Sequence, residues 1–310
     1  MKFKKFLAVL CGAALALTLA ACGGTSADSG NAPADSGTEG GTLVGLSVST
    51  LNNPFFVTLT EGAKSAAAAQ GVQLVVVDAG DDSAKQVSDI EDLLSRKIGV
   101  LIVNPVDSDA AAPAVQDAVD AGVKVISVDR VVNGVDVDCA IASDNVQGAT
   151  MATEYLVSLI GEGAKVVELE GVPGASATID RGAGFHAVAD EKLNVASSQT
   201  ANFNRAEGMT VMENMLQANP DIQGVFAHND EMALGAVEAI SGTDIVVVGF
   251  DATDDAIAAV QDGRMAATVA QKPDMMGATA VETAVKLING EAVEKEMPVE
   301  VALVTAENAG

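Results

Sequence analysis

The sequence predicts an α/β protein with two doubly wound parallel β-sheets, one in each of two lobes. The first observation is that strand and helix patterns alternate along nearly the whole chain from Leu43 onward. The second is that most strand patterns end in a short polar segment that leads into a helix. The third is the number of strands, because roughly ten is the upper limit of one open sheet.

The segment at residues 43–56, LVGLSVSTLNNPFF, contains this pattern in its shortest form. An apolar, β-branched run ends at Ser49, and Asn52 and Asn53 lead to Pro54 and two phenylalanines. Proline at the first helical position gives up no hydrogen bond, and an asparagine before it can cap the exposed backbone N–H groups. We therefore expect a buried strand that leads into a helix at a sheet edge, where open α/β sheets bind their ligands.

The remaining elements follow from the same periodicities. In residues 83–97, four apolar side chains recur on one helical face, namely Val87, Ile90, Leu93 and Leu94. Strands are expected at residues 43–49, 72–77, 100–103, 123–128, 140–142, 165–169, 195–199, 224–227, 245–250, 265–270 and 299–304. Helices are expected at residues 54–70, 83–97, 110–121, 145–160, 177–192, 205–218, 231–240, 254–261 and 274–289.

The composition suits this fold and excludes one class of partner. The chain has 310 residues, of which 49% are hydrophobic and 3% aromatic. It is long enough for two cores, and its many small residues allow close packing of helices on sheets. The formal net charge of −26 repels nucleic acid and anionic lipid surfaces. We therefore expect no nucleic-acid partner.

The N-terminus has the pattern of an export signal. Lys2, Lys4 and Lys5 precede an apolar stretch at residues 6–19, which is shorter than the roughly 20 residues of a membrane span. The stretch ends in Leu19-Ala20-Ala21-Cys22, which resembles the lipobox of bacterial lipoproteins. We expect a signal peptide at residues 1–21, a lipid on Cys22 and a flexible Gly/Ser-rich linker at residues 22–42. The alternative is an ordinary secretory leader with an incidental cysteine.

No catalytic or metal site is expected. Cys139 is the one cysteine left beyond Cys11 and Cys22, so no internal disulfide can form, and it is expected to be a buried small side chain. The only histidines, His186 and His228, do not suffice for a zinc cluster. A G-x-G-x-x-A string at residues 182–187 has no strand directly before it, so it is a weak match to a dinucleotide site. We expect neither a catalytic residue nor a cofactor.

Polar side chains that follow the predicted strands form the candidate site. They are Asn53, Asn104, Asp129, Arg130, Asn229 and Asp251. Each also has a local alternative, as a helix cap, as a turn residue before proline or, for Asp129 and Arg130, as a surface ion pair. Together with Phe55 and Phe56 they suit a carbohydrate, because sugar hydroxyls pair with carboxylates, arginines and amides while C–H faces stack on aromatic rings.

Motifs along residues 43–304 resemble those of the ribose-binding proteins, in order and with similar spacing. They are STLNNPFF at 49–56, VNPVDSD at 103–109, SVDR at 127–130, IASDN at 141–145, DRGAGF at 180–185, FNR at 203–205, HNDEMALGA at 228–236, VVGFD at 247–251 and VAQKPD at 269–274. These proteins are the substrate-binding components of ABC sugar importers and have the type I periplasmic-binding-protein fold. The resemblance therefore implies two lobes joined by a three-segment hinge.

Carried over residue by residue, the resemblance implies a sugar site with two kinds of contact. The residues that hydrogen-bond the sugar would be Asn53, Asn104, Asp129, Arg130, Arg181, Asn229, Asp251 and Gln271. The rings that sandwich it would be Phe55, Phe56 and Phe203. Two positions depart from the family pattern. His228 replaces a usual Gln and is expected on the lobe surface, and Ile179 replaces a charged residue of some relatives, which alters a rim or a partner surface.

The resemblance also implies a division of the chain and a role. One lobe would comprise residues 43–143 and 272–300, and the other residues 144–271 and 301–310. The protein would be an exported, lipid-anchored monomer on the outer face of the cell membrane, or on the periplasmic side in a two-membrane cell. It would deliver D-ribose to an ABC permease, with a chemoreceptor as a second candidate partner. Alternative ligands are allose, psicose or a furanose signal molecule.

Two other classes of protein share parts of this pattern. A sugar-responsive repressor would need an N-terminal DNA-binding helix-turn-helix, where this chain has an export signal. A sugar-modifying enzyme could use Asp129 and Asp251 as paired carboxylates. Against an enzyme, Arg130 and the neighbouring amides are expected to keep both carboxylates ionised, so that they accept hydrogen bonds rather than donate protons.

Overall fold

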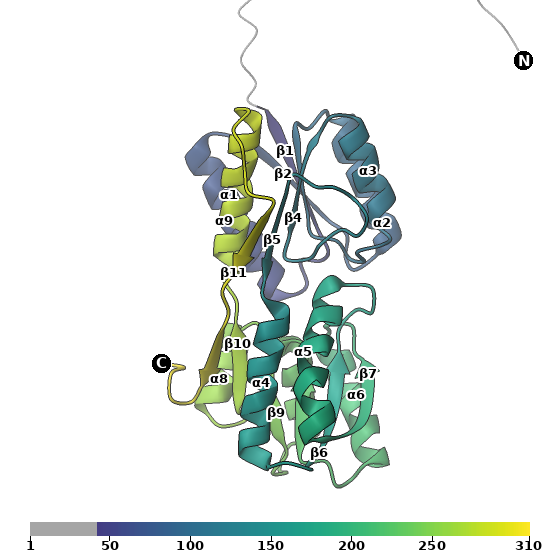
Figure 1. Cartoon of the computed structure of the whole chain (residues 1–310), viewed down its shortest axis with the longest axis vertical. Helices are drawn as coiled ribbons and strands as arrows, with labels where there is room; N and C mark the ends of the chain where they lie inside the picture. Colours follow the sequence, from purple (N-terminus) through teal and green to yellow (C-terminus); the bar gives the residue numbers. More distant parts are fainter. Residues whose placement is uncertain (1–41) are drawn as a thin grey trace, which may run out of the picture. The chain divides into compact units, whose positions relative to one another are not determined.

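The structure, a computed structural model, describes residues 42–310. The predicted signal peptide, the predicted lipidation site Cys22 and all of the predicted linker except Thr42 lie outside these residues. Within them, the strands form two six-stranded sheets, each packed between helices (Figure 1). The predicted α/β class with two doubly wound sheets is therefore confirmed.

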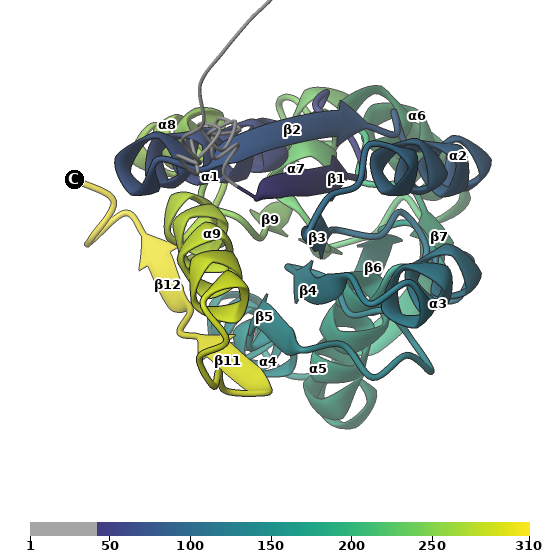
Figure 2. The ribbon, with the colours of Figure 1, turned by 90° about the horizontal axis from the view of Figure 1, so that it is seen from above.

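The first sheet has the strand order β11-β5-β4-β3-β1-β2 and is parallel throughout. Figure 2 shows this sheet from above, with α1 and α9 on one side and α2 and α3 on the other. Its strands are β1 (Leu43–Val48), β2 (Gln73–Asp78), β3 (Val100–Val103), β4 (Lys124–Val128), β5 (Cys139–Ser143) and β11 (Glu296–Val299). Its helices are α1 (Pro54–Gln70), α2 (Ser83–Ser95), α3 (Ala112–Asp120) and α9 (Pro273–Ile288).

The second sheet has the order β12-β10-β9-β8-β6-β7, and only its edge strand β12 runs antiparallel. Its strands are β6 (Lys165–Glu170), β7 (Asn194–Thr200), β8 (Gly224–Ala227), β9 (Val246–Val248), β10 (Ala267–Ala270) and β12 (Ala302–Thr305). Its helices are α4 (Asn145–Ile160), α5 (Ser176–Lys192), α6 (Arg205–Ala218), α7 (Asp230–Ala239) and α8 (Asp254–Gln261).

The chain passes from one sheet to the other after β5, after β10 and after β11, which gives the expected three-segment connection (Figure 1). The single final strand predicted at residues 299–304 is wrong, because β11 and β12 are separate strands in different sheets. The apolar run is interrupted where Glu300 and Val301 cross between the sheets. Pro298 is accommodated because β11 is an edge strand, where a missing N–H donor is tolerated.

Local sequence fixes the elements that carry the site. Asn53 caps α1, since its side-chain oxygen accepts a hydrogen bond from the backbone N–H of Phe55 at 2.9 Å. The helix ends at Gly71, whose φ of 67° lies in the left-handed region that glycine adopts without strain. In both sheets the central strands are buried, so the carboxyl ends of the strands are held rigidly. Among residues 42–310, no helix combines the length and apolar character that crossing a bilayer requires.

Candidate functional site

The carboxyl ends of both sheets contribute to one cavity with an empty volume of about 240 Å³. The residues that line it are Asn53, Phe55, Phe56, Asp129, Arg130, Ala177, Arg181, Phe203, Asn229, Asp251 and Gln271. The structure thus brings together ten of the eleven side chains that the sequence placed in the site. Asn104 does not line the cavity, and Ala177 is a lining residue that carries no polar group from which sequence reasoning could have found it.

We call the side that follows the strands of the first sheet the first wall, formed by Asn53, Phe55, Phe56, Asp129 and Arg130. The side that follows the strands of the second sheet, together with Ala177 and Arg181 of α5, is the second wall, formed by Ala177, Arg181, Phe203, Asn229, Asp251 and Gln271. Each wall contains one arginine, one buried aspartate and at least one phenylalanine ring.

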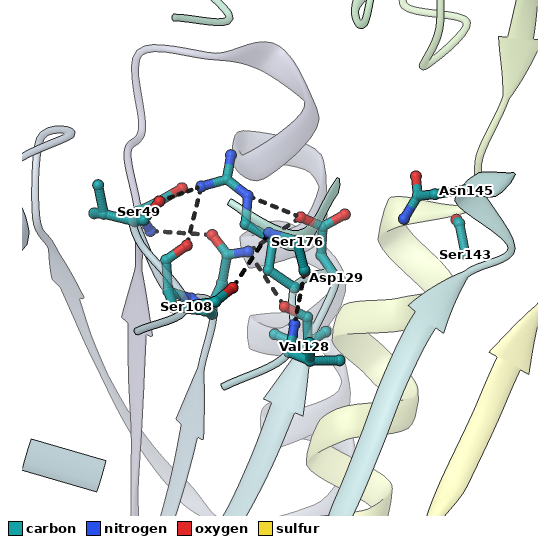
Figure 3. A network of polar contacts seen from close by, with 12 residues as sticks. Ser49, Ser108, Val128, Asp129, Ser143, Asn145 and Ser176 are labelled. Atoms are coloured by element: carbon teal, nitrogen blue, oxygen red, sulfur yellow. Dashed lines mark hydrogen bonds and ion pairs between the residues drawn. The ribbon is translucent and has the colours of Figure 1, made fainter. Parts of the chain in front are cut away.

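In the first wall, Asp129 is held from behind by Asn104. The Asn104 Nδ2 group donates to Asp129 Oδ2 at 3.1 Å and to the Val128 carbonyl at 3.2 Å, and its Oδ1 atom accepts from the Ser49 N–H at 3.1 Å. Figure 3 shows Ser49, Val128 and Asp129 within this network, with Ser143 and Asn145 apart from it. Asn104 therefore orients a lining carboxylate rather than facing the cavity itself.

Arg130 is buried in the first wall with one unpaired donor. Its Nη1 atom donates to the Pro105 carbonyl at 3.0 Å, while its Nε atom lies 3.7 Å from Asp129 Oδ2. Among the described residues, Nε has no hydrogen-bond partner. An unsatisfied buried donor is costly, so this atom is well suited to an oxygen of a bound molecule.

Aromatic rings approach the cavity from both sides. The guanidinium carbon of Arg130 lies 5.2 Å from the ring centroids of both Phe56 and Phe203, which belong to opposite walls. Phe55 packs edge-on against Phe56, with ring centroids 5.1 Å apart. A Cβ atom on Gly171 would overlap the Phe203 ring, so that ring lies directly on the glycine. The guanidinium group of Arg130 thus lies near aromatic rings of both walls.

In the second wall, Arg181 is the central cation. Its Nε donates to Asn145 Oδ1 at 2.8 Å, and its Nη1 donates to the His228 carbonyl at 2.6 Å and lies 3.6 Å from Asp251 Oδ1. Asp251 also accepts a hydrogen bond from Gln271 Nε2 at 2.7 Å. An ion pair and a hydrogen bond thus connect Arg181, Asp251 and Gln271, and all three line the cavity.

A further buried acid, Asp230, lies behind this wall and was not predicted. It accepts hydrogen bonds from Thr268 Oγ1 at 2.6 Å and from the Thr253 N–H at 2.8 Å. Burial, against the opposing effect of these bonds, raises the pKa of Asp230 to about 7. Its position at the start of α7 gave it the appearance of an ordinary acidic first-turn residue.

Burial also alters the lining carboxylates. It raises the pKa of Asp129, although the charge of Arg130 acts in the opposite direction. It raises the pKa of Asp251 well above its ordinary value of 3.8, against the charge of Arg181 and with the charge of Asp230. Both groups are therefore weaker acids than we expected from the neighbouring arginine and amides, because desolvation outweighs the favourable charges.

The backbone is strained at the same place. Asp129 has a φ of 66° and Phe203 a φ of 57°, values that residues with a side chain rarely adopt. Asp251 has a φ of 128°. Such conformations concentrate at ligand sites, where the surrounding structure holds them.

Direct hydrogen bonds join the two lobes beside the cavity. The Ser108 N–H donates to the Gly174 carbonyl at 2.9 Å, and the Ser176 N–H donates to Ser108 Oγ at 3.2 Å. Ser176 Oγ in turn accepts from the Val131 N–H at 3.1 Å, and Figure 3 shows Ser108 and Ser176 in this network. These bonds hold the lobes close together on one side of the cavity.

The structure gives the burial of three further residues that were discussed from the sequence. Cys139 is fully buried, as predicted. Ile179 is 56% exposed. The expectation that His228 lies on the lobe surface is wrong, because His228 is fully buried and bonds to Glu168. A buried glutamate on the neighbouring strand provides a partner that spacing along the sequence does not reveal.

The fold and the cavity define a class of protein, a two-lobed α/β protein that encloses a small polar molecule between its lobes. The chain belongs to the family described as periplasmic binding protein domain, whose model matches residues 44–292. It is 50% identical over 275 residues to the ribose import binding protein RbsB of Bacillus subtilis (strain 168), with 88% of this chain and 90% of that protein covered. It is 49% identical to the protein of that name from Escherichia coli (strain K12), with 85% and 90% covered.

Solved structures agree with this assignment. An ABC transporter solute binding protein from Bacillus halodurans C-125 with bound myo-inositol has a TM-score of 0.83 and 34% identity, with 88% of this chain and 97% of that chain covered. A periplasmic solute binding protein from Actinobacillus succinogenes 130z with bound D-allose has a TM-score of 0.80 and 31% identity, with 86% and 99% covered. These relatives are binding proteins, which agrees with the prediction that the chain is not an enzyme.

Proposed function

We propose that the protein captures D-ribose between its two lobes and delivers it to the permease of an ABC importer. The observation that carries the proposal is the composition of the cavity, which is lined by buried aspartates, arginines and phenylalanine rings from both lobes. The similarity to ribose import binding proteins over most of the chain supports the choice of sugar and of transporter class.

Each wall would bind a different part of the sugar. Asp129 and Asp251 would accept hydrogen bonds from hydroxyls, and the unpaired Nε of Arg130 would donate to a sugar oxygen. Phe56 and Phe203 would cover the apolar C–H faces of the ring. Because only the closed arrangement satisfies both sets of contacts, sugar binding would shift the hinge equilibrium toward it.

The relatives also support a set of alternative ligands. Allose, psicose or a furanose remain the alternative ligands, since relatives include a D-apiose import binding protein 37% identical to this chain and the structure with bound D-allose.

The remaining parts of the proposal concern placement in the cell. We propose that the chain is exported and anchored by a lipid on Cys22, with residues 22–42 as a tether. We further propose a monomer, with residues 43–143 and 272–300 in one lobe and residues 144–271 and 301–310 in the other. The permease would be its partner, and a chemoreceptor is a second candidate.

A thermal-shift panel of pentoses and hexoses tests the ligand. A specific sugar stabilises the native state by mass action, so D-ribose should raise the melting temperature more than any other sugar. Calorimetry should then show weaker ribose binding by Asp251→Ala, by on the order of 2–3 kcal/mol, because a buried hydroxyl loses a charged acceptor. Unchanged affinity of this variant would remove Asp251 from the site, and a larger shift with allose would replace ribose as the ligand.

A further inference from the structure

A buried pair of titratable residues, Glu168 and His228, lies behind the second wall. Glu168 belongs to β6, His228 directly follows β8, and both side chains are fully buried. Glu168 Oε1 lies 2.8 Å from His228 Nε2. Neither side chain lines the cavity, and the contacts assigned to the sugar above do not use them.

His228 is connected to three parts of the second wall, through its imidazole, its backbone carbonyl and its chain neighbour Asn229. Its carbonyl accepts the 2.6 Å hydrogen bond from Arg181, and its chain neighbour Asn229 donates through Nδ2 to the Phe203 carbonyl at 3.4 Å. Its Nδ1 atom accepts from the N–H of Gly171 at 3.4 Å, and the Phe203 ring lies on that glycine. The imidazole therefore contacts the glycine beneath the Phe203 ring directly. By anchoring residue 228 to Glu168, it also places the backbone that accepts from Arg181 and continues into Asn229.

The two hydrogen bonds determine the form of the imidazole. A backbone N–H can only donate, so Nδ1 must accept and carries no proton. The proton then resides on Nε2, which donates to the carboxylate of Glu168. The arrangement requires a neutral histidine with an ionised glutamate as its acceptor.

We infer that His228, held by Glu168, is a positioning residue for sugar binding that keeps Arg181, Asn229 and Phe203 in their binding geometry. The inference rests on the proposed function. Losing the imidazole would remove the acceptor of the Gly171 N–H and the partner of Glu168 Oε1. The other carboxylate oxygen, Oε2, would keep His186, whose Nε2 lies at 3.1 Å.

The charged groups around the pair favour this state at neutral pH. They are Glu168, Glu170, Arg181, His186, Asp190 and Asp230. Burial lowers the pKa of His228 despite its bond to Glu168. Burial acts to raise the pKa of Glu168, but the hydrogen bond and charge of His228 and its other partners outweigh it, and the pKa is lowered. Both shifts preserve the neutral imidazole and the ionised carboxylate.

Acidification should break the arrangement in a defined way. Below the lowered pKa of His228, protonation would place a second N–H on Nδ1, directly opposite the Gly171 N–H. Two donors cannot share that contact, so the Gly171 segment and the Phe203 ring on it would have to move. Protonation of His228 should therefore add to the loss of ribose affinity in acid that the lining aspartates, whose pKa values are also raised, cause by themselves.

The test compares two replacements of His228 in the full-length chain by calorimetric titration with D-ribose. Gln can donate to Glu168 and accept from Gly171 with one side chain, so His228→Gln should retain affinity within threefold. His228→Leu can do neither and should bind at least tenfold more weakly. As the control in the same lobe, Asp221→Asn changes a surface carboxylate that is 67% exposed and pairs with Lys165, and it should change affinity less than threefold.

Nitrogen NMR of protein labelled with ¹⁵N-histidine supplies a second readout. A histidine with a purely structural role would show no change in its signals when ribose binds. The chain has two histidines, so His186→Leu assigns both signals. His228 should show a neutral Nε2–H imidazole at pH 7, and its signals should shift on ribose addition. The acid loss of ribose affinity should be smaller in His228→Gln than in the wild type.

The outcomes separate the two levels of the proposal. If the wild type binds no ribose or related sugar, the proposed function fails and the inference fails with it. If the wild type binds but His228→Leu keeps its affinity, or if the proton of His228 is on Nδ1, the inference alone is overturned. If His228→Leu does not fold, the comparison of His228→Gln with the wild type across pH decides, and identical profiles contradict the inference.

Discussion

The two walls of the cavity hold their carboxylates by different means. In the first wall, Asp129 accepts a hydrogen bond from the neutral amide of Asn104, and Gln86 donates to the backbone carbonyl of Asn104 at 2.9 Å. In the second wall, Asp251 lies near the cation Arg181 and the second buried acid Asp230. Both aspartates thus lie near a buried arginine, but the first wall adds neutral hydrogen bonds from Asn104, whereas the second adds another buried acid, Asp230. The second wall should respond more strongly to pH and to the loss of one charge.

The largest expected effect comes from removing the cation of the second wall. Arg181→Met would leave Asp251 without its nearby positive charge and the His228 carbonyl without its donor. Breaking a buried ion pair costs about 3–5 kcal/mol, so the free energy of unfolding should fall by that amount in urea titrations at pH 7.

The control is Arg264→Met, in the same lobe, which removes an arginine whose side chain is 52% exposed. Exposed pairs contribute about 0–1 kcal/mol, so this variant should unfold almost as the wild type does. If the two variants lose the same free energy of unfolding, the distinction between buried and exposed charges is contradicted.

A smaller effect is expected on ribose affinity from the first wall. Asp129→Asn keeps the size of the side chain but replaces a charged acceptor with a neutral amide. Calorimetry should show binding weakened by about 2–3 kcal/mol. Asp262→Asn, at a surface carboxylate 50% exposed, should bind ribose as tightly as the wild type, and an unchanged Asp129→Asn would exclude that carboxylate from the site.

The pH dependence of the free energy of unfolding should show an effect of the second wall. Its size should be similar to, or slightly smaller than, the loss of ribose affinity in Asp129→Asn. The pKa of Asp230 is raised to about 7 in the folded protein, against about 3.9 in an unfolded chain. The folded state therefore binds the proton more tightly, and the contribution of Asp230 to stability is greatest in acid and is lost as pH rises toward 7. Between pH 5 and 7 this loss is about 2 kcal/mol for the ligand-free protein.

The measurement is urea unfolding of the wild type and Asp230→Asn at both pH values. The variant cannot titrate, so its stability relative to the wild type should improve by this amount from pH 5 to pH 7. A constant difference between the two proteins would show that Asp230 does not carry the effect.

The smallest expected effect lies outside both walls, at the hydrogen bonds between the lobes. Ser108→Ala removes the hydroxyl that accepts from the Ser176 N–H but leaves the backbone bond to Gly174. One neutral hydrogen bond contributes about 0.5–1.5 kcal/mol, so ribose affinity should fall by no more than tenfold. Small-angle scattering of the ligand-free variant should show a more open mean conformation, and an unchanged profile with unchanged affinity would show that this bond does not favour closure.

Much of the fold and most of the site could be predicted from the sequence. Asn53, Asp129, Asn229 and Asp251 each follow a strand, and parallel strands bring such residues to one sheet edge. Whether the carboxyl edges of the two sheets face each other, by contrast, depends on how the lobes pack. Only the family resemblance implied that they do. Arg181 illustrates this, since it lies within α5, where its pattern resembles that of an ordinary helical arginine.

The sequence could not predict which side chains are buried or redirected by partners far away along the chain. His228 looks like a surface residue until Glu168, sixty positions away along the chain, is placed beside it. Asn104 follows a strand like the lining residues, yet its amide is directed at Asp129 rather than at the cavity. The division of the last apolar run into β11 and β12 has the same origin, because the two strands pair with different sheets.

The most direct measurement is a crystal structure of the protein grown with D-ribose. The account predicts one sugar between Phe56 and Phe203, with its hydroxyls hydrogen-bonded to Asp129 of the first wall and Asp251 of the second. A sugar bound to one lobe only, or at a place that contacts neither aspartate, would contradict it.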